Sequence, residues 1–294
     1  MSQPLRRTEE SNEQATSDRL TDKQYARVAK LVSDFVGIKL PAAKRIMVEG
    51  RLRKRMRALG HESLKNYCTF LFDGDGLETE FVHLIDAVTT NKTDFFRENE
   101  HFSFLANEIV PHLMNRRRPG ERTLIKLWSA ASSTGAEAYT IAMVMAELAA
   151  RRRELDFEVL GTDISTEVLG QAVLGIYPKE MMVTVPEDIS RRYVMRGQSA
   201  KHRDHVRIVP ELRRRVRFMR LNLVADKYPL HRDMDVIFLR NVLIYFDKST
   251  QEAVTCRMID HLRPGGFLVL GHSESVIGSS LKLRQWAPAI FQRA

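Results

Sequence analysis

The sequence predicts an α/β protein with a doubly wound, mostly parallel sheet, preceded by an all-helical domain and interrupted by a small antiparallel β insertion. Three patterns indicate this fold class. Apolar residues recur at helical spacing up to about residue 89, short apolar runs alternate with helical segments from about residue 120, and the segment between Asp163 and Asp235 is longer than one sheet crossover requires. With 294 residues, the chain is long enough for two domains of roughly 100 to 200 residues each.

The N-terminal part is predicted to be a polar tail followed by helices. Residues 1–18 are charged and almost free of large apolar groups, so we expect them to be disordered. A helical domain follows over residues 19–89. Its first helix lies in "LTDKQYARVAKLVSDFVGI", where Thr21 and Gln24 have the spacing of a capping box.

A basic helix is predicted next, from Pro41 to Gly60, with proline near its start and glycine past its end. The pattern is open to two interpretations: a solvated face, or a docking surface for an acidic partner. Further helices in "SLKNYCTFLF" and "ETEFVHLIDAVT" complete the domain. The basic residues of the helix are Arg51, Arg53, Lys54, Arg55 and Arg57.

Residues 90–294 alternate predicted strands and helices. The strands are "TLIKLWSA", "FEVLGTDIS", "MDVIFLRN" and "FLVLGHSES", and the helices between them are "AEAYTIAMVMAELAARRREL", "TEVLGQAVLGIY" and "QEAVTCRMIDHLRPGG". This order is typical of a parallel sheet with helices on both faces. Ligands of such sheets bind beyond the carboxyl ends of the strands, so the residues after each strand are the candidate site.

The antiparallel insertion is expected at about residues 184–218. There, "HVRIV" and "RRVRFMRL" alternate apolar and charged residues on either side of "PELR". This pattern predicts that the two runs pair as antiparallel strands.

Two features after the first strands point to an adenosine-bearing ligand. The small residues of "SAASSTGAE" permit a tight turn in which Gly135 takes a positive φ angle. Asp163 ends the second strand, where such folds place a carboxylate that accepts hydrogen bonds from ribose hydroxyls. Each feature has a plainer alternative: the loop could serve only packing, and Asp163 could cap the helix that follows it.

Composition narrows the class of protein. A formal charge of +9 favours an acidic partner, whether nucleic acid, anionic lipid or protein. We expect a cytoplasmic protein without membrane insertion, because no run approaches the roughly 18 apolar residues of a membrane span and the N-terminus has no signal-peptide pattern. Cys68 and Cys256 are far apart, and no His-Glu-x-x-His pattern occurs, so neither a disulfide framework nor a metal site is expected.

Several separated motifs together resemble one family. They are "NKTDFFREN" (residues 91–99), "WSAASSTGAEAYTIAM", "GTDIST", "LRNVLIYFD" (239–247) and "LRPGGFLVLGHSES" (262–275). By itself "NKTDFFREN" could be part of a surface helix. In this order, and together with the basic helical domain, the motifs resemble the CheR family of chemotaxis receptor glutamate O-methyltransferases over residues 20–294. The resemblance implies a class I S-adenosylmethionine-dependent methyltransferase sheet.

The resemblance also implies the roles of individual residues. Arg97 would lie beside the methyl donor and the incoming substrate, and Tyr245 would face the methyl group. The implied products are glutamyl methyl esters on the cytoplasmic helices of methyl-accepting chemotaxis proteins, and S-adenosylhomocysteine. The residues implied to bind S-adenosylmethionine are Asn91, Thr93, Arg97, Glu137, Asp163, Asn222, Leu223, Arg240 and Asn241.

This chemistry suits the residue types. A glutamate side chain, with a reference pKa of about 4.3, is already an anion at neutral pH and needs no general base. The enzyme must supply in-line geometry and exclude water. The planar Arg97 guanidinium can hold a carboxylate in a fixed orientation by paired hydrogen bonds.

The chain departs from the family in two places. Relatives usually carry an acidic residue and a proline where this chain has Ala136 and Ala138, which changes how the helix start is set. Some members bind a C-terminal receptor tether on the β insertion, and here the loop "GQSAKHRDH" lacks the second glycine typical of those members. Because receptor methylation regions are acidic helical bundles, the basic helix becomes a candidate docking surface.

Two other functions compete with receptor methylation. Amino-methylating enzymes that act on nucleic acid usually carry Asp/Asn-Pro-Pro-Tyr/Phe after the fourth strand, where this chain has "LRNVLIYF", so no nucleic-acid substrate is expected. A non-catalytic module that senses S-adenosylmethionine and binds receptors is the alternative that Ala136 and Ala138 make conceivable.

Overall fold

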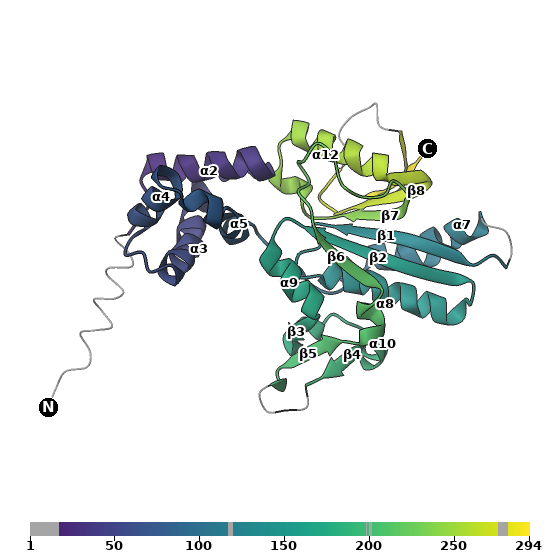
Figure 1. Cartoon of the computed structure of the whole chain (residues 1–294). Coiled ribbons are helices and arrows are strands. Elements are labelled where there is room, and N and C mark those ends of the chain that lie inside the picture. The colour runs from purple at the N-terminus through teal and green to yellow at the C-terminus, as the bar shows by residue number, and fades with distance from the viewer. Residues whose placement is uncertain (1–17, 117–119, 198, 200–201, 276–281) are drawn as a thin grey trace. The chain divides into compact units, whose positions relative to one another are not determined.

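The computed structural model describes residues 18–116, 120–197, 199, 202–275 and 282–294. Its contacts divide the chain into two compact units, Met1–Thr90 and Asn91–Ala294, which are described separately (Figure 1). Apart from Asp18, the segment for which we predicted a disordered tail lies outside the described residues.

The first unit consists of helices, as predicted. Thr21 caps the first of them by accepting a hydrogen bond from the Gln24 backbone N–H, while the Gln24 side chain bonds back to Thr21, so the capping box is confirmed. Gly37 ends that helix in the left-handed conformation, with φ 71°. The helices are α2 (Asp22–Val36), the 3-10 turn η1 (Ala42–Lys44), α3 (Arg45–Ala58), α4 (Leu64–Asp73) and α5 (Gly76–Val88).

Most arginines of α3 bind partners inside the first unit. Arg55 donates to both carboxylate oxygens of the buried Glu80, at 2.6 and 2.5 Å. Arg51 and Arg53 donate to backbone carbonyls of the same unit. The predicted basic face is therefore only partly free for an external partner. The exposed basic residues of the predicted set are Lys54 and Arg57.

The second unit is built on a seven-stranded sheet in the order β6-β2-β1-β7-β8-β10-β9. The first five strands are parallel, and β10 is antiparallel to both β8 and β9. This sheet confirms the predicted fold class. The strands are β1 (Thr123–Ala130), β2 (Leu155–Asp163), β6 (Val216–Arg220), β7 (Met234–Leu239), β8 (Leu262–Leu270), β9 (Leu283–Ala287) and β10 (Ile290–Arg293).

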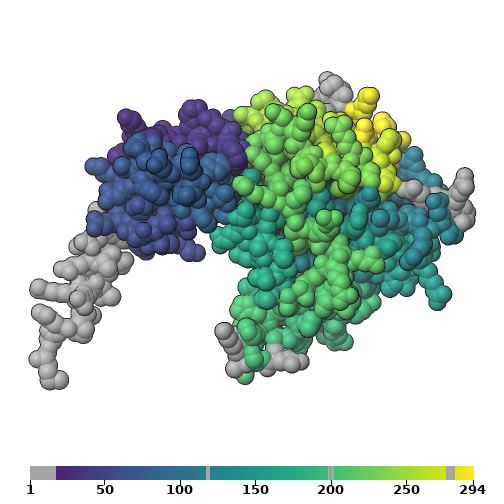
Figure 2. Space-filling model, viewed as in Figure 1, coloured from purple at the N-terminus to yellow at the C-terminus, as the bar shows by residue number. Residues whose placement is uncertain are grey.

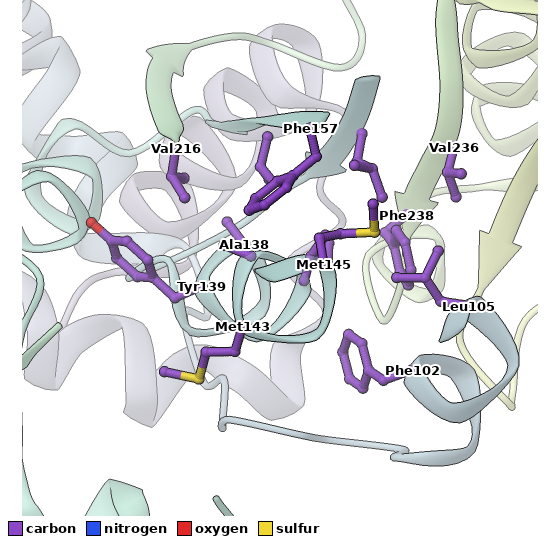
Figure 3. Packing of buried hydrophobic residues seen from close by; sticks show 14 of the residues in the cluster. Phe102, Leu105, Ala138, Tyr139, Met143, Met145, Phe157, Val216, Val236 and Phe238 are labelled. Carbon is purple, nitrogen blue, oxygen red and sulfur yellow. The ribbon is translucent and has the colours of Figure 1, made fainter. Parts of the chain in front are cut away.

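Helices cover both faces of the sheet, with α8 on one face and α12 on the other (Figure 1). The core between α8 and the strands is apolar: Met145 of α8 meets Phe238 of β7, and Phe102 stacks on Phe238 with ring centroids 5.8 Å apart (Figure 3). The helical segments are α6 (Glu100–Phe104), the π-helical η2 (Leu105–Ile109), α7 (Val110–Asn115), α8 (Ala136–Arg151), α9 (Thr166–Leu174), the 3-10 turn η5 (Leu243–Tyr245) and α12 (Lys248–His261).

The insertion, defined here as residues 176–214, carries a three-stranded antiparallel sheet in the order β3-β5-β4. It forms the lower green and teal part of the second unit in Figures 1 and 2. Its elements are β3 (Ile176–Pro178), η3 (Lys179–Met182), α10 (Glu187–Tyr193), β4 (Val194–Arg196), β5 (His205–Ile208) and α11 (Pro210–Arg213).

The strand pairing that we predicted for the insertion is wrong. "HVRIV" forms β5 as expected, but "RRVRFMRL" forms β6, which pairs in parallel with β2 at the edge of the main sheet. The physical reason lies in "PELR", which folds as the helical turn α11 and carries the chain out of the small sheet. Val216 of β6 is then buried in the main core.

Among the residues that the structure describes, no helix combines the length and the apolar character that crossing a bilayer requires.

Candidate active site

Most of the residues that we predicted to form the site follow the carboxyl ends of the parallel strands. The loop of residues 131–135 follows β1, and Asp163 ends β2. Asn222 and Leu223 come shortly after β6, and Arg240 and Asn241 come directly after β7. Because these strands are parallel, their ends meet at one edge of the sheet, where doubly wound folds bind ligands.

Asp163 holds the loop after β1. Its carboxylate accepts hydrogen bonds from the backbone N–H groups of Ser133, at 2.8 Å, and Ser165, at 3.0 Å. The Ser133 hydroxyl in turn donates to the Asn91 carbonyl at 2.7 Å. The side chain that caps α9 is Ser165, so the alternative role of Asp163 as the helix cap is wrong. These contacts bring Asn91, the loop and Asp163 together.

Gly135 takes the positive φ that we predicted, 86°, at the start of α8. A Cβ atom there would lie 2.9 Å from the Phe218 ring, so glycine is required for space as well as for conformation. The two departures from the family, Ala136 and Ala138, are fully buried in the first turn of α8.

Arg240 lies between two carboxylates at the end of β7. Its Nη1 donates to Glu137 at 2.8 Å, and its Nη2 lies 3.0 Å from Glu98 and also donates to the Arg97 carbonyl. Glu137 accepts a further hydrogen bond from the Ser129 hydroxyl at 2.7 Å. Only 1% of the Arg240 side chain is exposed, so the two carboxylates compensate a buried cation.

Glu98 is a site residue that sequence reasoning missed. Its carboxylate also accepts hydrogen bonds from the Asn241 side-chain amide at 3.1 Å and the His272 backbone N–H at 3.3 Å. Burial alone would raise the pKa of Glu98, but the hydrogen bonds from Asn241 and Arg240 outweigh it and lower the pKa to about 2. The only signal in the sequence was its position beside Arg97.

Glu274 was also missed, although it lies within the motif "GHSES". It is buried, and its carboxylate accepts three backbone hydrogen bonds, each 2.8 Å long, from Asn241, Leu243 and Gly271. Glu274 therefore fixes the turn between β7 and η5. Tyr245 ends this 3-10 turn and is half-buried.

The segment 91–99, called the arginine arm below, contains no helix, so the surface-helix interpretation is wrong. Phe95 is fully buried, and the Phe96 backbone N–H donates to the Thr140 hydroxyl at 3.2 Å. The Arg97 side chain is exposed, with one long hydrogen bond of 3.4 Å to the Lys92 carbonyl. Thr93 is half-buried.

Backbone strain is concentrated around this edge of the sheet. Six described non-glycine residues have positive φ, and only Ala289 of these is far in sequence from the arm and the loops after β1 and β7. Left-handed conformations cost energy for such residues and persist where the surrounding structure enforces them. The other five are Phe96, Glu98, Ala131, Ser133 and Asn241.

Unpartnered buried polar atoms in the described residues test the fit of a donor molecule. Three of them, Ser132 Oγ, Thr134 Oγ1 and Arg240 Nε, belong to the loop after β1 and the end of β7. Buried polar atoms normally have partners, so these atoms favour a polar ligand. Asp163 and Glu137 add carboxylates that can accept from ribose hydroxyls and an ammonium group, and the set fits a nucleoside with an amino-acid tail.

A group of possible metal ligands lies beside Glu98. The ligand atoms of Glu98, His101 and His272 lie within 4.8 Å of one another. Arg240 and Asn241 already bind the Glu98 oxygens, so a divalent cation would have to displace a buried guanidinium. Burial and the nearby Arg240 charge lower the pKa of His101 to about 4, so this ring is neutral at pH 7.

The sheet and the chemistry of the site define the class of protein as an S-adenosylmethionine-dependent methyltransferase. The "CheR methyltransferase, SAM binding domain" model matches residues 91–289, and the "CheR methyltransferase, all-alpha domain" model matches residues 23–89. The chain belongs to the CheR family, as the motifs predicted.

Relatives match over most of their length. A chemotaxis protein methyltransferase of Klebsiella aerogenes is 41% identical over 256 residues, which cover 87% of this chain and 84% of that protein. The Escherichia coli protein of the same name is 40% identical, covering 87% and 85%. That of Borreliella burgdorferi is 34% identical over 275 residues, covering 93% and 95%.

Proposed function

We propose that the protein methylates glutamate side chains on the cytoplasmic helices of chemoreceptors, with S-adenosylmethionine as methyl donor. The observation that carries this proposal is the contrast between two neighbours in the arginine arm. The Glu98 carboxylate is held by Arg240 and Asn241, whereas the Arg97 guanidinium is exposed and can receive a carboxylate. The activity would take place in the cytoplasm, where these receptor helices lie.

The donor site of the proposal comprises the residues around the sheet edge. Asp163 would bind the ribose, while Glu137 and Arg240 would bind the amino-acid part, and the contacts that join these side chains to the loops after β1 and β7 support both assignments. The remaining proposed donor contacts are Asn91, Thr93, Arg97, Asn222, Leu223 and Asn241.

The proposed chemistry needs no base. When bound, S-adenosylmethionine supplies a methyl group on a positively charged sulfur. The substrate carboxylate, ionised at neutral pH, attacks that methyl carbon. The new O–CH3 bond forms while the electron pair of the S–CH3 bond returns to sulfur, and no proton moves. The products are a glutamyl methyl ester and S-adenosylhomocysteine.

Arg97 and Tyr245 would orient the reacting groups. The guanidinium of Arg97 can align the acceptor carboxylate by two parallel hydrogen bonds. Tyr245 lies on the turn η5, whose start at Leu243 is fixed by Glu274, and its hydroxyl would orient the acceptor or the donor methyl. Positioning of this kind can supply roughly 7 to 11 kcal/mol of barrier reduction.

Two surfaces are proposed to bind the receptor. Lys54 and Arg57 of α3 would contact the acidic helical bundle. The insertion carries a groove of about 290 Å³, lined in part by Ile176, Met195 and Arg207, that could hold an added tether strand. Ile176 and Met195 are apolar side chains left 42% and 48% exposed beside this groove, which favours a partner there.

Methyl transfer to a receptor fragment tests the function. Labelled S-adenosylmethionine is incubated with the cytoplasmic fragment of a chemoreceptor, and label released as methanol by mild base is counted, since carboxyl esters hydrolyse under these conditions. We expect base-labile label that falls at least about 100-fold in Arg97→Ala. Lys92→Ala, an exposed neighbour, is the matched control. Base-stable label, or donor binding without transfer to several receptors, would refute the proposal.

A further inference from the structure

The insertion contacts the arginine arm directly. Thr184 lies between η3 and α10, and its hydroxyl donates to the Phe95 carbonyl at 2.7 Å, across 89 residues of sequence. Phe95 is two positions before Arg97. Val185, next to Thr184, is buried in the main core, which fixes the segment that carries the hydroxyl.

Tyr177 of β3 makes a second link. Its ring meets the Phe95 ring edge to face, with centroids 5.0 Å apart and planes at 87°. Its hydroxyl donates to the Thr134 carbonyl at 2.6 Å, in the loop after β1. Tyr177 is 2% exposed, so both contacts are shielded from water. One residue of the insertion therefore touches both the arm and the proposed donor loop.

These contacts matter because the Arg97 side chain makes few contacts that would hold its guanidinium in one direction. Its hydrogen bond to the Lys92 carbonyl is 3.4 Å long, and the residues on either side, Phe96 and Glu98, have left-handed backbones with φ of 52° and 54°. The direction of the guanidinium is thus set by how firmly the backbone is held. Arg240 and Asn241 hold it after Arg97, and the insertion holds it before Arg97.

We propose that the insertion is a positioning element of the active site, in which Thr184 sets the arm that carries Arg97 and Tyr177 joins that arm to the donor loop. This inference rests on the proposed function, because it assigns Arg97 the alignment of the substrate carboxylate. In this proposal neither residue contacts substrate: Thr184 acts through the Phe95 backbone, and Tyr177 acts through the Phe95 ring and the Thr134 backbone.

Substitution of Thr184 tests whether this residue positions the arginine arm. Thr184→Val keeps the shape of the side chain and removes the donor, and because Thr184 is exposed the variant should fold normally. We expect kcat for methyl transfer to fall about fivefold, the rate equivalent of one net hydrogen bond, with the KM for S-adenosylmethionine unchanged. Thr184→Ser restores the hydroxyl and should restore kcat. Val183→Ala, at a neighbour that is 85% exposed, should resemble wild type.

Hydrogen exchange of the arm gives a readout that does not need a substrate. In Thr184→Val, the amides of residues 94–98 should exchange faster than in wild type, while those of β1 do not change. Tyr177→Phe keeps the ring against Phe95 and loses the hydroxyl. It should weaken S-adenosylmethionine binding about fivefold in calorimetry, without faster exchange in the arm.

The outcomes separate the two proposals. If wild type transfers methyl to the receptor fragment but Thr184→Val equals it in kcat and arm exchange, the positioning role is refuted and the proposed function stands. If wild type transfers nothing, the proposed function fails, and the exchange measurement still decides whether the insertion orders the arm. A fall in kcat that Thr184→Ser does not restore also overturns the inference.

Discussion

Glu98 and Arg240 are 142 residues apart in sequence, and Glu98 Oε2 lies 3.0 Å from Arg240 Nη2. This ion pair ties the arginine arm to the end of β7, and Arg240 extends the link to Glu137 at the start of α8. Three separate parts of the second unit are therefore joined through one buried guanidinium. Loss of either acid leaves that cation with half of its compensation.

Replacement of Glu98 should reduce both activity and stability. In Glu98→Gln we expect at least a tenfold loss of kcat, because the arm is less firmly held. The low pKa of Glu98, about 2 against the usual 4.5, stabilises the folded state fully above about pH 4.5, and this contribution is lost as pH falls toward 2. The difference in Tm between wild type and variant should be constant from pH 5 to 8 and shrink below pH 4.5. Glu100→Gln, at an exposed neighbour, is the control.

His101 should make the protein sensitive to acid over a different range. Its folded pKa of about 4 lies below the usual 6.5, so the unfolded chain binds a proton between these values that the folded protein does not bind. Stability therefore falls as pH drops from 6.5 to 4. His101→Phe should lack this part of the slope in urea unfolding at pH 7.5, 5.5 and 4.5. A variant at the exposed His83 is the control. If His101→Phe shows the same dependence of stability on pH as this control, the role of His101 is contradicted.

Glu274 should be required for donor binding without contacting the donor. Glu274→Ala removes the acceptor of three backbone N–H groups, and hydrogen bonds to a charged group contribute about 1.5 to 3 kcal/mol each. We expect the free energy of unfolding to fall by about 3 kcal/mol or more, with weaker S-adenosylmethionine binding in calorimetry. Glu274→Gln, which keeps one carbonyl oxygen, should be intermediate. Ser273→Ala is the control. If Glu274→Ala binds S-adenosylmethionine as tightly as wild type does, this role of Glu274 is refuted.

The arginines of α3 should separate into structural and docking residues. Arg55→Met leaves Glu80 buried without its partner, which costs about 3 to 5 kcal/mol, and it should lower the Tm of the protein. Lys54→Glu combined with Arg57→Glu should leave Tm unchanged but raise the KM for an acidic receptor fragment, more strongly at low salt. A KM that does not respond to this double charge reversal would exclude docking through α3.

Local patterns in the sequence were sufficient for much of the fold. The capping box at Thr21, the positive φ of Gly135 and the alternation of strands and helices are confirmed, because each depends on residues close together in the chain. The partner of β6 depended on a choice between two sheets, which an alternating pattern cannot distinguish. Its actual partner, β2, lies more than 50 residues away.

The missed site residues have a related cause. Glu98 and Glu274 act mainly on backbone N–H groups and on side chains that reach them from other strand ends. Such contacts exist only once the turns have formed, and two of those turns use left-handed backbones at Glu98 and Asn241. Asparagine is favoured in this conformation, but glutamate is not. The roles that the family resemblance implied for the predicted site residues all remain predictions.

The left-handed residues around the sheet edge limit which amino-acid substitutions this protein can accept. At Ala131, Ser133 or Asn241 a β-branched side chain would add to the cost of the positive φ, so fewer of the twenty residue types are compatible with each position. A comprehensive scan of substitutions should therefore find that this edge tolerates fewer substitutions than any other part of the second unit, even at residues whose side chains do not contact substrate. The backbone conformation that positions the site residues therefore also makes this edge the region where a random substitution most often abolishes function.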